Sequence, residues 1–390
     1  MTRRAVILVL DGVGGGAAHD AADYGDSGSD TIGNMAHALG GLDLPALQQL
    51  GLGRACPRSG LGSSLPPTGA WGRMQPASAG KDSTTGHWEL AGLRLTTSFP
   101  TFPDGFPDSL LARFSEATGR GALGNVAASG TEILDRLGER HMRTGDWIVY
   151  TSADSVFQVA AHVDVVAPER LYAACEAARA LLVAPFDVSR VIARPFAGEP
   201  GAWYRVSEQR RDFSLLPPGE TLLDVLAEAG IERAGIGKVD DLFAGRQIRS
   251  THTVGNADGL RAIEGWLEGP SVGLLFANLV DFDQLYGHRN DVQGFYGALR
   301  EFDAALPSLL HALREDDLLL ITADHGNDPT TPSTDHSREA VPLLVAGARV
   351  RAVSLGERRT FADVGATVAD WFGLAWRGTG TSVLPACIAQ

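Results

Sequence analysis

The sequence of 390 residues predicts an α/β protein with a mainly parallel sheet flanked by helices. Two observations support this prediction. Short apolar runs typical of buried strands alternate along the chain with segments of helical periodicity. Three of these runs also end in acidic residues, as expected where parallel strands bring side chains to one edge of a sheet.

The expected strands are short apolar runs, and many of the expected helices lie between them. We expect buried parallel strands at Ala5–Leu10, Ile148–Tyr150, Val191–Ala193, Val272–Leu279, Leu318–Thr322 and Val341–Val345. We expect helices at Pro45–Leu50, Pro107–Thr118, Pro168–Leu182, Thr221–Ala229 and Val292–Leu313. The first apolar run follows two arginines but is too short for a signal peptide, so we interpret it as a strand.

Composition limits the possible partners. The formal net charge is −14, from 33 Lys and Arg against 47 Asp and Glu, which argues against binding to nucleic acid or to anionic membranes. No apolar stretch is long enough to span a bilayer. Three cysteines without a CxxC pair are expected to be buried, reduced thiols. We therefore expect a cytoplasmic protein; the oligomeric state is not evident, and a monomer is expected.

The acidic strand ends come from distant parts of the chain. Asp11 follows the first strand, Asp281 and Asp283 follow a late one, and Asp324 follows a third. If these ends converge on one site, the middle of the chain is an insertion. We expect residues 1–96 and 217–390 to form a discontinuous metal-binding core, with residues 97–216 as an inserted domain.

Carboxylates mixed with imidazoles at strand ends suit Zn²⁺, Mn²⁺ or Fe²⁺. A single Asp-His pair is more often a surface pair, but the joint occurrence favours a metal site. Six ligands exceed what one catalytic ion with open positions needs, so two ions fit better. The candidate ligands are Asp11, Asp283, His288, Asp324, His325 and His336. Asp281 is expected to point to the other face, and Asp335 to support a ligand.

A candidate nucleophile lies in the segment Gly80–Glu89, which has consecutive hydroxyls at Ser83, Thr84 and Thr85. A hydroxyl beside a metal ion is a usable nucleophile near neutral pH. The alternative is a helix N-terminus, where a hydroxyl caps the first turn and Glu89 assists. The two interpretations are compatible, because a helix N-terminus also favours a bound phosphate.

Together these segments resemble the phosphopentomutase family of the alkaline phosphatase superfamily, over nearly the whole chain. The metal motifs point only to the superfamily, whereas the middle segments are more specific. The matching segments are Gly25–Gly33, Gly80–Glu89, Ala128–Glu132, Tyr150–Phe157, Arg190–Gly198, Gly235–Lys238, Asn278–Arg289, Thr322–Asp328 and Thr334–His336.

The resemblance implies an alkaline phosphatase-like core with an inserted α+β cap domain that binds substrate. It implies an isomerase of nucleotide and pentose phosphate metabolism that interconverts (deoxy)ribose 1-phosphate and (deoxy)ribose 5-phosphate. Two Mn²⁺ ions are the implied cofactors, with other divalent metals possible. A phosphorylated enzyme and a sugar bisphosphate, which serves as intermediate and activator, are also implied.

The resemblance implies a role for each candidate ligand, assigned by its position in the matching motifs. One metal, shared with the nucleophile, is held by Asp11, Asp324 and His325; the other is held by Asp283, His288 and His336. The phosphorylated position is Ser83, where the family usually has threonine; Thr84 and then Thr85 are the alternatives. Gly12 is a second departure, since the family more often has serine there.

The substrate contacts are also implied by position. The residues expected to line the sugar are Ser152, Asp154 and Val156. The residues expected to bind the distal phosphate are Arg190, Arg194, Arg205 and Lys238. We interpret Arg210 and Arg211 as ordinary surface residues.

Rival interpretations share the metal ligands. A phosphatase or phosphodiesterase of the same superfamily would need every one of them, but would have no assigned role for the middle segments. Another phosphosugar mutase, or a cofactor-independent phosphoglycerate mutase, would carry different cap motifs. A non-catalytic phosphosugar-binding protein is disfavoured by the complete ligand set and the hydroxyl loop.

Overall fold

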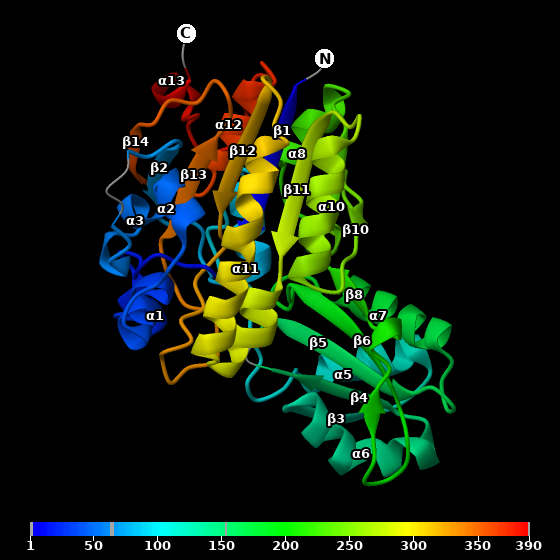
Figure 1. The fold of residues 1–390 in the computed structure, drawn as a ribbon. Coiled ribbons are helices and arrows are strands. Elements are labelled where there is room, and N and C mark those ends of the chain that lie inside the picture. The colour runs from blue at the N-terminus through cyan, green and yellow to red at the C-terminus, as the bar shows by residue number, and fades with distance from the viewer. Residues whose placement is uncertain (1–2, 63–65, 153, 389–390) are drawn as a thin grey trace. The chain divides into compact units, whose positions relative to one another are not determined.

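The computed structural model describes residues 3–62, 66–152 and 154–388, and the chain divides into two compact units. The first unit is discontinuous and comprises Met1–Ser98 and Pro217–Gln390. The second is Phe99–Leu216. Figure 1 colours the chain by residue number, so the first unit combines blue segments with yellow and red ones.

The first unit contains an eight-stranded sheet, and five of its seven strand pairs are parallel. In spatial order the strands are β10 (Ser250–Thr251), β9 (Arg233–Ile236), β11 (Gly273–Leu279), β1 (Arg4–Leu10), β12 (Asp317–Thr322), β13 (Val341–Ala346), β2 (Ala70–Met74) and β14 (Ser354–Arg358). The predicted mainly parallel α/β fold is confirmed.

The strand β1 lies between β11 and β12 and is parallel to both. All seven of its residues are buried, which explains why Ala5–Leu10 is continuously apolar rather than alternating. Leu10 pairs with Leu279, and Val9 pairs with Thr322. The carboxyl ends of the three strands therefore reach the same edge of the sheet.

One predicted strand direction is wrong. Strand β13 is antiparallel to both β12 and β2, with Leu320 opposite Val345. A loop rather than a crossover helix connects β12 to β13, so the chain turns back and β13 begins at the end of the sheet where β12 stops. The apolar run at 341–345 predicted a buried strand but carried no information on its direction.

Helices pack on both faces of this sheet. Gly259 of α10 meets the side chain of Leu279, whereas His87 of α4 contacts Phe276 and Asn278, which point to the other face of β11. Helices α10 and α11 pack together. The α-helices of this unit are α1 (Thr31–Leu39), α2 (Pro45–Leu50), α3 (Leu52–Ala55), α4 (Ser83–Leu90), α8 (Leu222–Glu228), α9 (Val239–Leu242), α10 (Asn256–Glu268), α11 (Val292–His311), α12 (Asp363–Trp371) and α13 (Leu384–Cys387).

The second unit has a mixed sheet with helices on both faces. Helices α5 (Asp108–Thr118) and α7 (Pro168–Leu181) cover one face, and α6 (Gly130–Thr144) packs on the other. The strands in spatial order are β3 (Ala122–Ala127), β4 (Trp147–Thr151), β5 (Val156–His162), β6 (Arg190–Ala197) and β7 (Tyr204–Arg205), and β8 (Arg211–Ser214) also pairs with β6.

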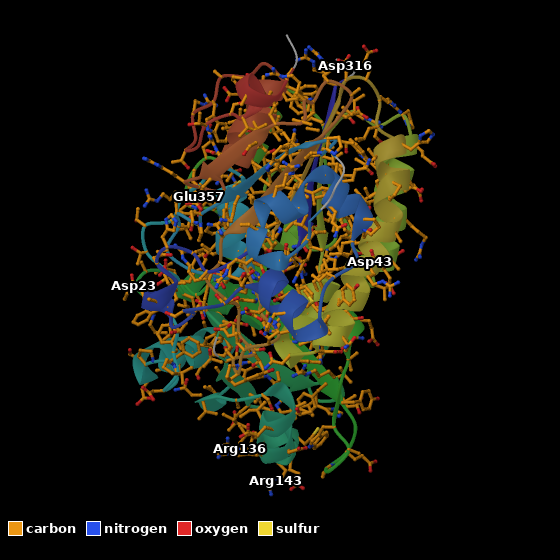
Figure 2. The ribbon with its side chains drawn as sticks, turned by 60° about the vertical axis from the view of Figure 1, so that its left-hand side comes forward. Asp23, Asp43, Arg136, Arg143, Asp316 and Glu357 are labelled. Atoms are coloured by element: carbon orange, nitrogen blue, oxygen red, sulfur yellow. The ribbon has the colours of Figure 1, made fainter. Side chains whose placement is uncertain are left out.

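The surface carries charged side chains, and the cysteines lie inside. Asp23, Asp43 and Glu357 are exposed on the first unit (Figure 2). All three cysteines are buried, unpaired thiols, as predicted. Within the described residues, no helix combines the length and the apolar character that crossing a membrane requires.

Candidate metal centre

Three acidic residues meet where the central strands end. Asp11 directly follows β1, Asp324 lies two residues beyond β12, and Asp283 lies in the π-helical turn η4 (Phe282–Tyr286) that follows β11. All three are buried, with 0%, 2% and 3% of their surface exposed. The parallel arrangement of β11, β1 and β12 thus gathers carboxylates from distant parts of the sequence.

One cluster consists of Asp11, Asp324 and His325. Nε2 of His325 lies 3.4 Å from Oδ1 of Asp11 and 3.4 Å from Oδ2 of Asp324. Two ligands of one tetrahedral ion lie about 3.4 Å apart when each metal–ligand bond is about 2.1 Å. The spacing of these atoms therefore suits a shared ion.

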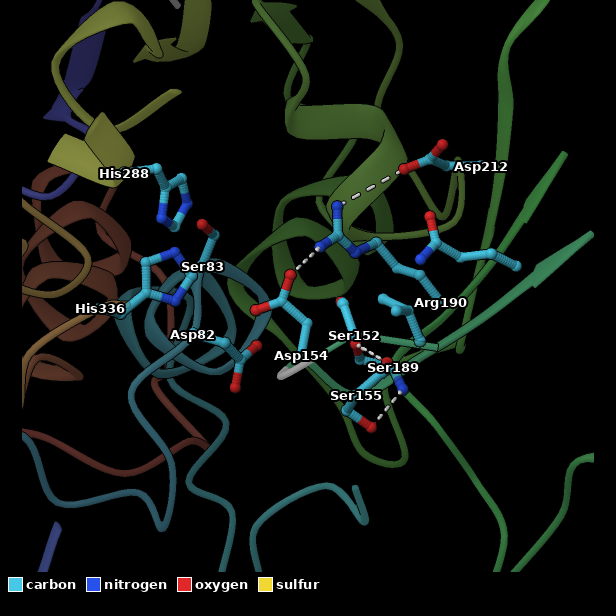
Figure 3. A network of polar contacts seen from close by, with 12 residues as sticks. Asp82, Ser83, Ser152, Asp154, Ser155, Ser189, Arg190, Asp212, His288 and His336 are labelled. Carbon is cyan, nitrogen blue, oxygen red and sulfur yellow. Dashed lines mark hydrogen bonds and ion pairs between the residues drawn. The ribbon is translucent and has the colours of Figure 1, made fainter. Parts of the chain in front are cut away.

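A second cluster consists of Asp283, His325 and His336, and His288 adjoins it. Nε2 of His288 lies 3.2 Å from Oδ2 of Asp283, and Nε2 of His336 lies 3.4 Å from Oδ1. The ring centroids of His288 and His336, both labelled in Figure 3, are 4.9 Å apart. The six predicted ligands therefore form two adjoining clusters, with His325 near both.

The charges of these clusters fit divalent cations. Both carboxylate oxygens of Asp11 and Oδ2 of Asp324 are buried without a hydrogen bond from any described residue. Burial would lower the pKa of His325, but the attraction of Asp324, Asp11 and Asp283 outweighs it and raises this pKa to about 10. Buried carboxylate oxygens that accept no hydrogen bond are unfavourable, and a bound cation removes that penalty.

The helix α4 presents Ser83 at its first position. Asp82 caps this helix by accepting hydrogen bonds from the Thr85 amide at 3.1 Å and the Thr85 hydroxyl at 2.6 Å. The hydroxyl of Ser83 lies 3.1 Å from Nε2 of His325, within hydrogen-bonding distance. Thr84 is buried. Of the three hydroxyls, that of Ser83 is thus placed beside a candidate ligand.

The expected help of Glu89 in capping is wrong. Its carboxylate accepts hydrogen bonds from the amides of Ala77 and Ser78, and from the Thr360 hydroxyl and the Phe361 amide. Glu89 therefore joins the end of α4 to two neighbouring loops, and Asp82 alone provides the side-chain cap.

Two neighbours of the ligands take different roles. Asp281 accepts a hydrogen bond of 2.6 Å from the Asn256 amide at the start of α10, so it points away from the clusters as expected. Asp335 accepts a hydrogen bond from the amide of His336 and lies 3.7 Å from Nζ of Lys81.

Lys238 lies in the first unit, at the N-terminus of α9, and not with the arginines of the second. Its Nζ is 3.5 Å from Oδ2 of Asp11. The structure therefore places this predicted phosphate-binding residue beside a candidate metal ligand.

Two supporting residues were missed from the sequence. Asn327 is fully buried and donates a hydrogen bond of 2.7 Å from Nδ2 to Oδ1 of Asp283. Arg338, which is 3% exposed, donates to the carbonyls of Ser78 and Gly80 at the start of the Gly80–Glu89 segment. Asn327 stands within the Asp324-His325-Gly326-Asn327 motif, which could have indicated it. Nothing in the local sequence distinguishes Arg338.

The predicted basic residues of the second unit share one face of its sheet. Arg190 and Arg194 are four residues apart on β6, Val156 is paired with Arg190, and Arg205 is paired with Phe196. This is the face that α6 covers in part. The guanidinium of Arg205 also lies against Gly130, at the N-terminus of α6.

Acidic and polar groups accompany these arginines. Arg190 lies between Asp154 and Asp212, at 4.0 and 3.5 Å (Figure 3). Arg194 donates to Gln158 at 3.0 Å, and burial lowers its pKa to about 10, so it stays charged at neutral pH. Ser152 is half-buried and lies in the loop that precedes β5.

The sequence comparisons with known proteins agree on the family of this chain. A family model described as the metalloenzyme superfamily matches residues 3–376. A phosphopentomutase from Carboxydothermus hydrogenoformans is 55% identical over 374 residues, which cover 95% of this chain and 96% of that protein. A phosphopentomutase from Acetivibrio thermocellus is 53% identical over 384 residues, covering 98% and 99%. Among solved structures, the PH0037 protein from Pyrococcus horikoshii has a TM-score of 0.52 at 15% identity and shares the fold over 97% of this chain and 100% of its own.

Proposed function

The chain belongs to the phosphopentomutase family, and from that premise we propose how its residues move a phosphoryl group between the two ends of a pentose phosphate. The chain is an enzyme, an isomerase of the phosphotransferring mutase type. The proposed substrates are (deoxy)ribose 1-phosphate and (deoxy)ribose 5-phosphate. The observation that carries the assignment is an identity above 50% to phosphopentomutases across nearly the whole chain.

We propose Ser83 as the residue that carries the phosphoryl group. Its hydroxyl is 3.1 Å from a candidate ligand, and its position at the start of α4 leaves free backbone amides to face a phosphate. Serine keeps the hydroxyl that the chemistry needs. The hydroxyl of Thr85 is already bonded to Asp82, which makes it a weaker candidate.

The proposed ion sites use the two clusters. One ion would be held by Asp11, Asp324 and His325, and the other by Asp283, His288 and His336. Mn²⁺ is the proposed metal, because mixed carboxylate and imidazole donors suit it. When bound, divalent ions neutralise charge on the transferring group and lower the pKa of the serine hydroxyl.

The transfer takes place in two halves. In the first, the O–P bond of phosphorylated Ser83 breaks, and the free hydroxyl of the pentose 1-phosphate forms a new O–P bond, giving a bisphosphate. The proton of that hydroxyl returns to the serine oxygen. In the second half, Ser83 takes the other phosphoryl group and gives up its proton to the released sugar hydroxyl. The resting enzyme therefore carries the phosphoryl group on Ser83, and a trace of sugar bisphosphate activates any enzyme that lacks it.

The second unit is the proposed substrate-binding cap. Arg190, Arg194 and Arg205 share one face, which offers bidentate donors for the distal phosphate. Arg205 lies at the N-terminus of α6, where free amides add to the attraction for an anion. Ser152, Asp154 and Val156 precede or begin β5 beside Arg190 and are proposed to contact the sugar. Lys238 is proposed as a further cation for the substrate.

The cellular setting is a further proposal. The net charge of −14 and the unpaired thiols support a cytoplasmic enzyme that binds neither nucleic acid nor membranes. A role in nucleotide and pentose phosphate metabolism follows from the proposed substrates. We propose a monomer.

One assay distinguishes the mutase from a hydrolase. The enzyme receives ribose 1-phosphate, Mn²⁺ and a trace of sugar bisphosphate, and ribose 5-phosphate and inorganic phosphate are measured separately. We expect isomer without release of phosphate. Phosphate released as fast as substrate disappears would instead identify a phosphatase.

The nucleophile is tested by matched variants. Ser83→Ala should abolish isomerisation and phosphorylation of the enzyme, while the Mn²⁺ content changes little, because the other ligands remain. Thr84→Val removes the neighbouring buried hydroxyl and should keep activity. If Ser83→Ala stays active, the carrier is another residue.

A further inference from the structure

His87 lies one helical turn after Ser83 and is fully buried. Its Nδ1 is 2.9 Å from the carbonyl oxygen of Ser83 and 3.2 Å from Oδ2 of Asp324. Because Nδ1 faces two oxygen acceptors, it must carry a proton. One imidazole N–H therefore points at both the proposed nucleophile residue and a proposed ligand of the ion beside it.

The other side of the ring is fixed by β11. Nδ2 of Asn278 lies 3.0 Å from Nε2 of His87, which can accept the amide hydrogen. Phe276, two residues earlier on the same face of the strand, stacks on the imidazole at 5.5 Å with an interplanar angle of 22°. The central strand thus sets the orientation of the ring.

An independent observation shows that α4 packs directly against the backbone of Asp324. A Cβ at Gly86 would lie 2.1 Å from the backbone oxygen of Asp324, a separation that no side chain tolerates. The absence of a side chain at 86 lets the backbones of the helix and of the ligand loop touch, and His87 makes the adjacent contact.

We propose that His87 is a positioning residue that fixes the distance between Ser83 and Asp324. The polar contact of 3.2 Å between Nδ1 and Oδ2 orients the carboxylate of Asp324. The packing of His87 on β11 keeps α4 from moving relative to that carboxylate. Side chains that orient metal ligands influence metal affinity and activity although they touch neither metal nor substrate. This inference rests on the proposed roles of Ser83 and Asp324.

Two amide variants distinguish the contact made by Nδ1 of His87 from the contact made by Nε2. In His87→Asn the side-chain nitrogen can occupy the place of Nδ1 and keep the polar contact with Asp324. In His87→Gln the amide reaches the place of Nε2 and keeps only the contact with Asn278. Both variants are polar and lose the aromatic ring, so a role in packing alone predicts equal damage.

The measurement is Mn²⁺ binding to the metal-free protein by calorimetry, in which Asp324→Asn identifies the binding phase of this site. We expect the Mn²⁺ affinity to fall no more than about threefold in His87→Asn and by about tenfold or more in His87→Gln. The value of kcat should follow the same order, whereas KM for ribose 1-phosphate should stay within about twofold.

Equal loss in both variants, or wild-type affinity in His87→Gln, would overturn the proposal. Asn278→Ala provides a second route if the His87 variants do not fold: it leaves Nδ1 in place but frees the ring, so a smaller loss of affinity is expected, and no loss contradicts the proposal. Metal binding is measured without substrate. If the protein binds Mn²⁺ but does not isomerise ribose 1-phosphate, the proposed function is refuted. The Mn²⁺ affinities of the His87 variants would still test the positioning role of His87.

Discussion

At the scale of single residues, the centre consists of buried carboxylates held in place by hydrogen bonds from their neighbours. Asp324 receives a hydrogen bond from the Gly12 amide, and Asp283 receives one from Asn327. Gly12 has a φ of +77°, and a Cβ there would approach Asn327 and Asp283 to 3.1 and 3.3 Å. The glycine after Asp11, which departs from the usual serine, therefore occupies a crowded turn with left-handed geometry.

Asn327 is expected to support one of the two ion sites. Asn327→Ala removes the donor to Asp283, so Mn²⁺ affinity at that site should fall about 10- to 100-fold while the Asp324 site is largely retained. Calorimetric titration of metal-free protein measures both. Asn34→Ala is the control, because Asn34 donates to Asp328, which is not a candidate ligand. Equal effects of the two substitutions would contradict this prediction.

Glu339 gives a testable pH dependence. Burial is the dominant effect and raises its pKa from 4.5 to about 7. Between these values the folded protein binds more protons than the unfolded chain, so the free energy of unfolding falls as pH rises from 4.5 to 7. The total contribution is at most about 3 kcal/mol.

Glu339→Gln should therefore flatten this part of the stability profile. Urea unfolding of metal-free protein between pH 4.5 and 8 measures it, and the exposed Glu301→Gln should leave the slope unchanged. If the profile of the Glu339→Gln variant runs parallel to that of the wild type, this carboxyl does not titrate in that range.

At the scale of elements, the position of α4 decides which of its hydroxyl groups lies close to the candidate metal ligands. The sequence predicted a helix N-terminus or a nucleophile loop at Gly80–Glu89, and the structure contains the helix with Ser83 at its first residue. Which of three hydroxyls approaches the ligands depends on the packing of α4 against β11 and the Asp324 loop. Helical periodicity alone does not determine this rotation.

The close approach of α4 is tested with glycine substitutions. Gly86→Ala places a methyl group 2.1 Å from the Asp324 carbonyl, so we expect at least about a tenfold loss of kcat and destabilisation of roughly 1–3 kcal/mol from overpacking. Gly297→Ala in α11 meets nothing within 4 Å and should stabilise by about 0.5–1 kcal/mol with normal activity. Thermal unfolding and steady-state kinetics measure both; an active, stable Gly86→Ala variant would contradict the geometry.

At the scale of the whole molecule, two units with separate cores divide the proposed tasks. Metal ligands lie only in the first unit among the residues proposed here, and the arginine face lies in the second. A ligand that binds only the folded state stabilises the region that contains its site. The two units are therefore expected to respond differently to metal.

Hydrogen exchange tests this division. Adding Mn²⁺ to metal-free enzyme should slow amide exchange in the loops after β1, β11 and β12, and leave β4, β5 and β6 nearly unchanged. Mg²⁺ at the same concentration is a useful comparison, since it favours oxygen ligands over imidazoles and should protect less. Equal protection of both units by Mn²⁺ would contradict the assignment of the ion sites to the first.

The sequence by itself predicted six of the strands, five of the α-helices and the chemistry of the family. The continuous apolar run of β1 predicted a buried strand because both of its faces are covered, and acidic residues after three such runs predicted a shared site. The motifs also identified the family. These features depend on residues that are close in sequence, so residue spacing and composition are enough to predict them.

Only the tertiary structure determined the direction of strand β13, which carboxylates lie close together and which residues hold them in place. Strand β13 is antiparallel because a loop returns the chain, and an apolar run reads the same in either direction. His87, Asn327 and Arg338 take part in the centre through contacts with residues far away in sequence, and even where a residue lies within a motif, as Asn327 does, its partner is known only from the structure. The order β11-β1-β12 brings the carboxylates together, and that order follows from packing of the whole chain.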